Sequence, residues 1–267
     1  NSIRELIGEY KNNIEELEKK FREIKIIDPA CGSGAFLIKA VDILLEIHKE
    51  ILRLKIRNNP EKYSDNGQTK MDKWNEESEA KKIIENNIYG VDINPESVAI
   101  TKLALFLKIA ERGKKLSELT NNIKVGNSLI SDKSIDKMAF NWELEFPQIF
   151  YDENGNKKNN NGFDIVIGNP PYVSAKLMSA SGMDNQKSFF KTEYISAFGI
   201  FDLYVVFVEK GIKLLKTEGE FSFIIPNKFM INDYGYNLRN FLINTTQLRE
   251  IRDVSKENIF EGVSVYP

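Results

Sequence analysis

Short apolar runs alternate with segments of helical spacing along the chain. The runs at residues 24–28, 87–93 and 163–168 are rich in β-branched residues and lack helical spacing, which indicates parallel strands covered on both faces. Apolar positions three and four residues apart predict helices from residue 35 to about 54 and from 95 to about 112. Strands that alternate with helices in this way predict an α/β fold.

The rest of the chain divides into further elements and polar connections. Residues 1–23 predict one amphipathic helix that packs against a domain formed by residues 24–267. Residues 55–82 predict a surface insertion that ends in a helical turn and is anchored by Trp74. The other predictions are a strand and turn at 123–130, long connections at 131–162 and 173–199, a helix at 201–216, a strand at 220–226, a helix at 232–244 and a strand at 247–254.

Composition narrows the class of protein. The chain has 267 residues, 42% of them hydrophobic and 28% charged, which is ordinary for a globular domain, and no apolar run is long enough to cross a membrane. A single cysteine, Cys31, and a single histidine, His48, argue against disulfides, zinc clusters and a catalytic triad, and suit a reducing cytoplasm.

The charge and the ends of the chain bear on its partners. A net charge of -2 means either that nucleic acid is not the substrate or that most of the phosphate-binding surface lies elsewhere. The chain begins without methionine and stops where a strand is just starting, so we expect a piece of a longer protein.

A glycine loop follows the first predicted strand. Asp28 ends the strand, Gly32 and Gly34 follow, and a long helix begins at Ala35. This arrangement lets the backbone approach a ligand at a helix N-terminus, but it lacks the G-x-G-x-x-G of dinucleotide sites and the Gly-Lys-Ser/Thr of triphosphate sites. A carboxylate before the glycines suits an ammonium group, such as that of the methionine part of S-adenosylmethionine.

Two later strand ends add polar groups. Asp92 closes the strand at 87–93, where an acidic residue binds both hydroxyls of a ribose, and Ile93 can pack on an adenine face. The alternative is that Asp92 is only a turn residue. Asn127, after the third strand, is a candidate to hydrogen-bond the adenine edge of the cofactor.

The segment from Gly168 to Tyr172 carries the candidate chemistry. Gly168 permits a sharp turn, and the two prolines that follow Asn169 stiffen the backbone and provide no N–H group. The Asn169 side-chain oxygen and the Pro170 carbonyl offer two acceptors for an exocyclic NH2 group, and Tyr172 offers a ring for stacking. The alternative is a rigid turn without chemistry.

Four motifs together resemble those of DNA adenine-N6 methyltransferases: DPACGSGAF at 28–36, GVDIN at 90–94, GNSL at 126–129 and NPPY at 169–172. The chain is most similar to the methyltransferase region of type IIG-like restriction-modification enzymes, in which one polypeptide cuts and methylates. The resemblance implies a class I S-adenosylmethionine-dependent methyltransferase fold, Rossmann-like, with a seven-stranded, mostly parallel sheet and helices on both faces.

The resemblance also implies roles for single residues. Asn169 and Pro170 hold the amino group of a flipped adenine, while Tyr172 stacks on the base and Phe260 completes the sandwich. No metal takes part. The implied S-adenosylmethionine contacts are Asp28, Ala30, Gly32, Gly34, Asp92, Ile93, Asn127 and Asn169.

Two features depart from the family pattern. The third motif often has Asp where this chain has Asn127, and the Thr-Pro motif that helps to seat the methionine end of the cofactor is absent from residues 1–23.

These observations predict site-specific methylation of adenine N6 in double-stranded DNA. A target-recognition region is expected in the same polypeptide outside these residues, and a nuclease fused upstream is left open. Two alternatives remain: a protein glutamine N5 methyltransferase, which also uses Asn-Pro-Pro-Tyr, and a non-catalytic cofactor- or DNA-binding module of a restriction assembly.

Overall fold

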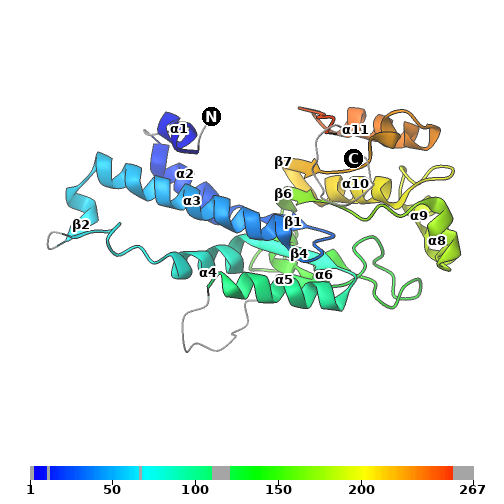
Figure 1. Cartoon of the computed structure of the whole chain (residues 1–267), viewed down its shortest axis with the longest axis horizontal. Coiled ribbons are helices and arrows are strands. Elements are labelled where there is room, and N and C mark those ends of the chain that lie inside the picture. The colour runs from blue at the N-terminus through cyan, green and yellow to red at the C-terminus, as the bar shows by residue number, and fades with distance from the viewer. Residues whose placement is uncertain (1–2, 11–12, 66–67, 110–120, 255–267) are drawn as a thin grey trace.

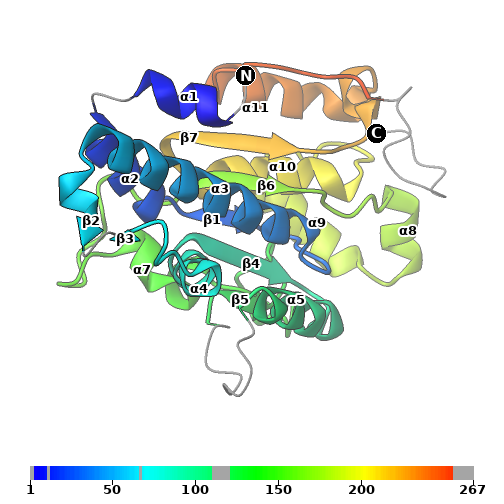
Figure 2. The same ribbon diagram turned by 60° about the vertical axis from the view of Figure 1, so that its left-hand side comes forward.

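A computed structural model describes residues 3–10, 13–65, 68–109 and 121–254. Its centre is a sheet with the strand order β5-β4-β1-β6-β7, in which all neighbouring strands are parallel (Figures 1 and 2). The strands are β1 (Ile26–Asp28), β4 (Ile88–Asp92), β5 (Ile123–Val125), β6 (Phe163–Gly168) and β7 (Leu215–Phe223). The parallel α/β architecture predicted from the sequence is therefore confirmed.

Helices cover both faces of the sheet, and α3 and α10 lie on opposite sides of it (Figure 2). The helices of the N-terminal half are α1 (Ile3–Glu9), α2 (Ile14–Glu23), α3 (Ala35–Asn58), α4 (Glu76–Asn87) and α5 (Pro95–Leu107). Those of the C-terminal half are α6 (Trp142–Glu145), α7 (Pro147–Phe150), α8 (Ala175–Ala180), α9 (Asp184–Glu193), α10 (Leu203–Leu214) and α11 (Tyr236–Thr245). No helix among the described residues is both long enough and apolar enough to cross a membrane.

The strand order determines where a ligand can bind. From β1 the chain moves outward to β4 and β5, and then returns to the other side of β1 to form β6 and β7. Because the two halves leave β1 in opposite directions, the connections separate at the carboxyl ends of β1 and β6 and leave a crevice there. The motifs that contain Asp28 and Asn169 lie at these two strand ends.

The N-terminal segment differs from its prediction. It forms two helices, α1 and α2, instead of one over residues 1–23. The N–H of Asn13 donates to the carbonyl of Tyr10, and Asn13 is the residue that precedes α2. Asparagine favours helix ends over helix interiors, which explains the interruption. Ile7 and Ile14 are buried in the same hydrophobic cluster as α3.

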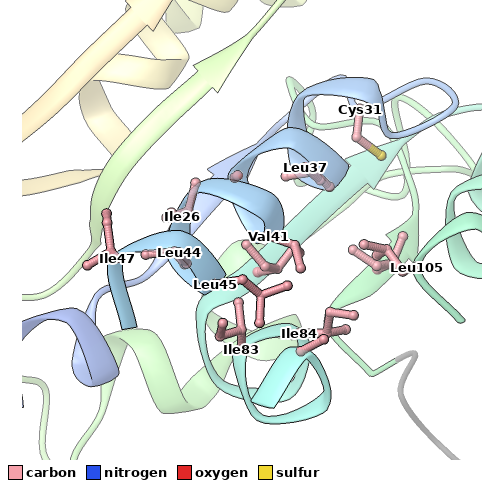
Figure 3. Close-up of a cluster of buried hydrophobic side chains, with 14 of the residues drawn as sticks. Ile26, Cys31, Leu37, Val41, Leu44, Leu45, Ile47, Ile83, Ile84 and Leu105 are labelled. Carbon is pink, nitrogen blue, oxygen red and sulfur yellow. The ribbon is translucent and has the colours of Figure 1, made fainter. Parts of the chain in front are cut away.

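Residues 55–82 were predicted as a surface insertion, but both ends of this segment belong to helices of the domain core. Helix α3 extends to Asn58, and the expected helical turn is the helix α4. Figure 3 shows Val41 and Leu45 of α3 next to Ile83 and Ile84 of α4. The surface part between them contains η2 (Glu61–Tyr63) and the hairpin of β2 (Ser64–Asp65) and β3 (Gln68–Thr69), and Trp74 packs against the core cluster.

The C-terminal half contains further corrections. The long connection predicted at 173–199 forms the two helices α8 and α9, whose short length and polar composition conceal any period. Strand β7 begins at Leu215, before the predicted strand, and passes an irregularity in register where Glu218 has a φ of 64°. After it come η3 (Asn227–Met230), η4 (Asp233–Gly235) and α11.

The number of strands also differs from the prediction. Residues 247–254 form no strand, and the described residues contribute five strands to the sheet instead of seven. A strand exists only when a neighbour pairs with its backbone. Residues 255–267 lie outside the described residues.

Candidate active site

The carboxyl ends of the strands surround a cavity of about 260 Å³. Its walls include five of the residues predicted as site residues: Ala30, Asp92, Ile93, Asn127 and Asn169. Two side chains from the connection after β6, Met183 and Phe190, close another side. The structure therefore brings the glycine loop, the ends of β4 and β5 and the Asn-Pro-Pro-Tyr segment to one place.

Two glycines shape the loop between β1 and α3. Gly32 and Gly34 have φ angles of 53° and 84°, which side chains rarely tolerate, and a Cβ atom on Gly34 would lie 2.7 Å from the Thr101 side chain. The Thr101 hydroxyl donates to the Gly32 carbonyl at 2.8 Å. The Gly32 N–H donates to Asp92 Oδ2 at 2.8 Å, so that the loop is tied both to α5 and to the end of β4.

Asp28 is a buried carboxylate, with 1% of its surface exposed. Its Oδ1 accepts the Ala30 N–H at 3.0 Å. Burial raises the pKa of Asp28 to about 7, and nearby Asp92 adds to this effect, while the hydrogen bond from Ala30 opposes it. A Cβ on Gly168 would lie 2.7 Å from Asp28 Oδ1, so glycine at the end of β6 gives the carboxylate its room. A bound cation would compensate for the cost of burying this charge.

Asp92 lies at the end of β4 and faces the cavity. Its Oδ2 accepts from Gly32, and its Oδ1 accepts the Asn94 N–H at 2.8 Å. The contact with Asn94 is that of a turn residue, as the alternative interpretation required. Each carboxylate oxygen can accept a further hydrogen bond, so ribose hydroxyls remain possible partners. Ile93 beside it is 53% exposed and offers an apolar surface to the cavity.

Asn127 makes four hydrogen bonds, one of which its backbone carbonyl accepts from the Ile130 N–H at 3.2 Å. Its backbone N–H donates to Met138 O at 2.6 Å, its Oδ1 accepts the Leu129 N–H at 3.1 Å, and its Nδ2 donates to Asp136 Oδ2 at 2.7 Å. One N–H and one acceptor position of the amide remain for a ligand. Sequence reasoning missed Asp136, because nothing in the polar segment after β5 distinguished it from the other carboxylates there.

Asn169 follows β6 directly, and Tyr172 lies against it. The Tyr172 hydroxyl is 2.5 Å from Asn169 Oδ1 and 3.1 Å from Ile224 O, with one proton to donate between these two acceptors. Burial raises the pKa of Tyr172 to about 12, which keeps the hydroxyl protonated. Its ring packs edge to face on Tyr204, with 6.4 Å between centroids. Among the described residues, no N–H group donates to the Pro170 carbonyl oxygen.

The remaining predicted site residues either lie beside the cavity or fall outside the described residues. Asp28, Gly32, Gly34, Pro170 and Tyr172 support the cavity without lining it. Phe260, predicted as the second stacking residue, lies outside the described residues. The described residues contain no group of three or more His, Cys, Asp or Glu side chains suited to a metal ion.

Sequence reasoning also missed two apolar residues of the cavity wall, Phe190 in α9 and Met183 just before it. Met183 and Phe190 are seven residues apart, with Gln186 on the same helical side, but the segment lacks a readable hydrophobic period. Only the packing of α9 onto the second hydrophobic cluster reveals that this side faces the cavity.

Comparison with known proteins shows the family of the chain. The family model described as Eco57I restriction-modification methylase matches residues 86–260, and a model described as RMKL-like methyltransferase domain matches residues 17–111. The chain is 31% identical over 277 residues to the type II restriction enzyme and methyltransferase RM.Eco57I of Escherichia coli, covering 99% of this chain and 26% of that protein. It is 25% identical to the adenine-specific methyltransferase PglX of Streptomyces coelicolor, covering 95% of this chain and 21% of that protein.

A solved structure shares the fold. The type IIL restriction-modification enzyme MmeI, solved in complex with DNA, aligns with a TM-score of 0.56 and 19% identity, over 89% of this chain and 29% of that one. The chain thus spans between a fifth and a third of the length of these proteins. By the match to the family model and the identity to RM.Eco57I, the chain belongs to the Eco57I restriction-modification methylase family.

Proposed function

We propose that this chain transfers a methyl group from S-adenosylmethionine to N6 of a flipped adenine in double-stranded DNA, as the methyltransferase part of a restriction-modification enzyme. The observation that supports it most is that one cavity of about 260 Å³ joins Asp92 and Asn127 to Asn169. A donor and an acceptor held in this cavity would react within one site, and such positioning is a large part of catalysis.

S-adenosylmethionine is the cofactor of this methyltransferase family, and the residues fit it. The buried carboxylate of Asp28 suits the ammonium group, and the glycine loop gives close access to the backbone. Asp92 would accept from the ribose hydroxyls, Ile93 would pack on the adenine, and Asn127 would hydrogen-bond its edge. The bound cofactor supplies an electrophilic methyl group on a sulfonium.

The acceptor side of the cavity would hold the amino group of the target base. Asn169 Oδ1 and the Pro170 carbonyl accept its two hydrogens, which draws the nitrogen lone pair out of the ring system and directs it at the methyl carbon. The bound cofactor would give up its methyl group to this nitrogen and keep the electron pair of the methyl–sulfur bond, and the nitrogen would then release one proton to solvent. Fixed acceptors supply the stabilisation, so no strong base is required. Tyr172 and Phe260 are proposed to stack on the extruded base.

The relatives support the choice of substrate. PglX is an adenine-specific methyltransferase, and MmeI was solved in complex with DNA. Residues 24–267 are proposed as the catalytic domain, with α1 and α2 as an N-terminal addition. Target recognition, and any nuclease, are proposed to reside in parts of a longer polypeptide, since the relatives are three to five times the length of this chain.

The test is Asn169→Ala in the full-length enzyme, assayed for methyl transfer to duplex DNA and for S-adenosylmethionine binding by calorimetry. Loss of the acceptor oxygen is expected to lower the transfer rate by a factor on the order of 100 or more, while the affinity for cofactor changes little. Asn154→Ala, in the exposed turn after Tyr151, is the matched control and is expected to be fully active.

Each rival function predicts a different outcome. Undiminished DNA methylation by Asn169→Ala would show that the assigned role is wrong. Methylation of a release-factor glutamine by the wild type, without methylation of DNA, would instead favour a protein methyltransferase. Cofactor binding without transfer to either substrate would favour the non-catalytic module.

A further inference from the structure

Asp136 lies behind the cavity wall that carries Asn127. Its Oδ2 accepts two side-chain hydrogen bonds, from Asn127 Nδ2 at 2.7 Å and from Gln186 Nε2 at 2.9 Å. Its Oδ1 accepts the backbone N–H of Met138 at 2.8 Å, which holds the carboxylate in a tight turn. Both oxygens are therefore held by donors from three different segments of the chain.

These contacts determine which way the Asn127 amide points. The Leu129 N–H donates to the amide oxygen at 3.1 Å, and Asp136 accepts from the amide nitrogen. If the amide were turned over, its NH2 group would face the Leu129 N–H and its oxygen would face a carboxylate. Each of these contacts is unfavourable, so the free N–H and the free acceptor position of Asn127, a residue of the cavity wall, have fixed directions.

We propose that Asp136 is a positioning residue that locks the Asn127 amide so that the amide distinguishes the adenine of the cofactor from other bases. This inference rests on the proposed function. Adenine presents an amino donor next to a ring-nitrogen acceptor, a pattern that a fixed amide matches with its own acceptor and donor. Hypoxanthine presents a carbonyl acceptor next to an N–H donor, and a locked amide cannot turn over to match it.

Gln186 links Asp136 to the side of the cavity where the target base would bind. It lies on α9, the helix that also brings Phe190 into the cavity wall, and its amide donates to the oxygen of Asp136 that Asn127 uses. A single carboxylate thus joins the GNSL loop, which would face the cofactor, to the helix that follows the Asn-Pro-Pro-Tyr segment.

The first experiment measures ligand discrimination by calorimetry in the full-length protein. The probes are S-adenosylhomocysteine and its inosine counterpart, S-inosylhomocysteine. The wild type is expected to prefer the adenosyl compound by about tenfold or more, the factor that one unmatched hydrogen bond gives. Asp136→Ala is expected to lower the ratio of the two dissociation constants several-fold, because only the Leu129 N–H then opposes turning the amide over. Asp136→Asn keeps an oxygen that accepts from Asn127 and is expected to retain the preference.

The matched control is Asp132→Ala. Asp132 belongs to the same loop, and its carboxylate accepts local hydrogen bonds from the side chain of Ser134 and from its backbone N–H, the latter at 2.7 Å. Its removal costs the loop a similar contact without touching Asn127, so the ratio of dissociation constants is expected to stay at the wild-type value.

The second experiment exchanges the two groups and does not depend on the alanine variant. Asn127→Asp alone sets two carboxylates against each other and is expected to weaken binding of S-adenosylhomocysteine about tenfold or more. The double variant Asn127→Asp with Asp136→Asn restores the donor–acceptor contact between the two side chains, and is expected to bind more tightly than the single variant but more weakly than the wild type, because the new carboxylate has no N–H for the ring nitrogen of adenine.

Two outcomes would overturn the inference: an equal loss of both ligands in Asp136→Ala, which is the mark of a merely structural role, and a double variant as weak as the single one. A wild type that bound neither compound would instead contradict the proposed cofactor, so the two failures are distinguishable.

Discussion

The carboxylate of Asp28 lies at the end of β1, is 1% exposed, and accepts a hydrogen bond from the Ala30 N–H at 3.0 Å. Since burial raises the pKa of Asp28 to about 7, this group is half protonated near neutral pH when no cation is bound. A raised pKa in the folded state destabilises the ionised form, so the free energy of unfolding without cofactor falls as pH rises from about 4 to about 7. Above pH 7 this contribution is constant.

The ammonium of S-adenosylmethionine would bind only the ionised carboxylate. Affinity for the cofactor is therefore expected to rise with pH, by up to about tenfold for each pH unit below 7, and to level off above 7. Calorimetry at pH values from 5.5 to 8.5 (roughly the range over which the raised carboxyl titrates) checks this expectation. Asp28→Asn is expected to bind weakly and to lose the dependence on pH. A wild-type profile that is flat, or one that Asp28→Asn retains, would contradict the assignment.

At the scale of elements, α4 illustrates how packing decides what a polar segment does. Half of its 12 residues are charged, yet Ala80, Ile83 and Ile84 are at most 1% exposed, and the side of the helix that carries them faces α3 (Figure 3). Asn75 caps the helix by accepting the Ser78 N–H, which gives a short helix a defined start. Helix α4 thus packs against β4, the strand whose end carries Asp92.

Because one side of α4 is buried, we expect substitutions on its buried and exposed sides to lower the free energy of unfolding by different amounts. Ile83→Ala is expected to lower the free energy of unfolding by about 2 to 4 kcal/mol, because it leaves a cavity between packed helices. Lys81→Ala, on the exposed side where Lys81 pairs with Glu85, is expected to lower it by less than about 1 kcal/mol. Urea unfolding followed by circular dichroism measures both, and equal effects would mean that α4 does not pack as described.

At the scale of the whole molecule, the net charge of -2 bears on the proposed substrate. Affinity for DNA at physiological salt comes largely from contacts between basic side chains and phosphates, and each such contact steepens the salt dependence. A slightly acidic domain is suited to hold one extruded base in a cavity and less suited to hold a duplex alone. If the chain is part of a longer polypeptide, as proposed, we expect most phosphate contacts to come from the other regions of that polypeptide.

The number of phosphate contacts that this chain makes can be measured from the salt dependence of its DNA binding. The 267-residue chain is expected to bind duplex DNA weakly, with a slope of log affinity against log salt that corresponds to only a few phosphate contacts. The intact polypeptide is expected to bind more tightly and with a steeper slope. Fluorescence anisotropy between 50 and 200 mM salt, roughly the range over which such slopes are read, compares the two. Equal slopes would place the phosphate contacts within this chain.

The sequence alone determined the parts of the protein that depend on local chemistry. The β-branched runs predicted β1, β4 and β6, because a strand buried on both faces needs continuous apolar residues. The order of the four motifs predicted the family, which the comparisons confirm. Five of the predicted site residues line the cavity, since strand ends in a parallel sheet meet at one edge.

Tertiary structure decided whatever depends on a partner distant in sequence. A helix such as α9 shows which side is buried only once the second hydrophobic cluster lies beneath it, so Met183 and Phe190 had no readable signal. The importance of Asp136 arises from Asn127 and Gln186, 9 and 50 residues away, which meet at one of its oxygens. Residues 247–254 likewise form no strand, since strand structure requires a neighbouring backbone and not merely a suitable sequence. Local patterns fix what a segment can become, but hydrogen bonds and packing between remote segments decide which of these possibilities is realised.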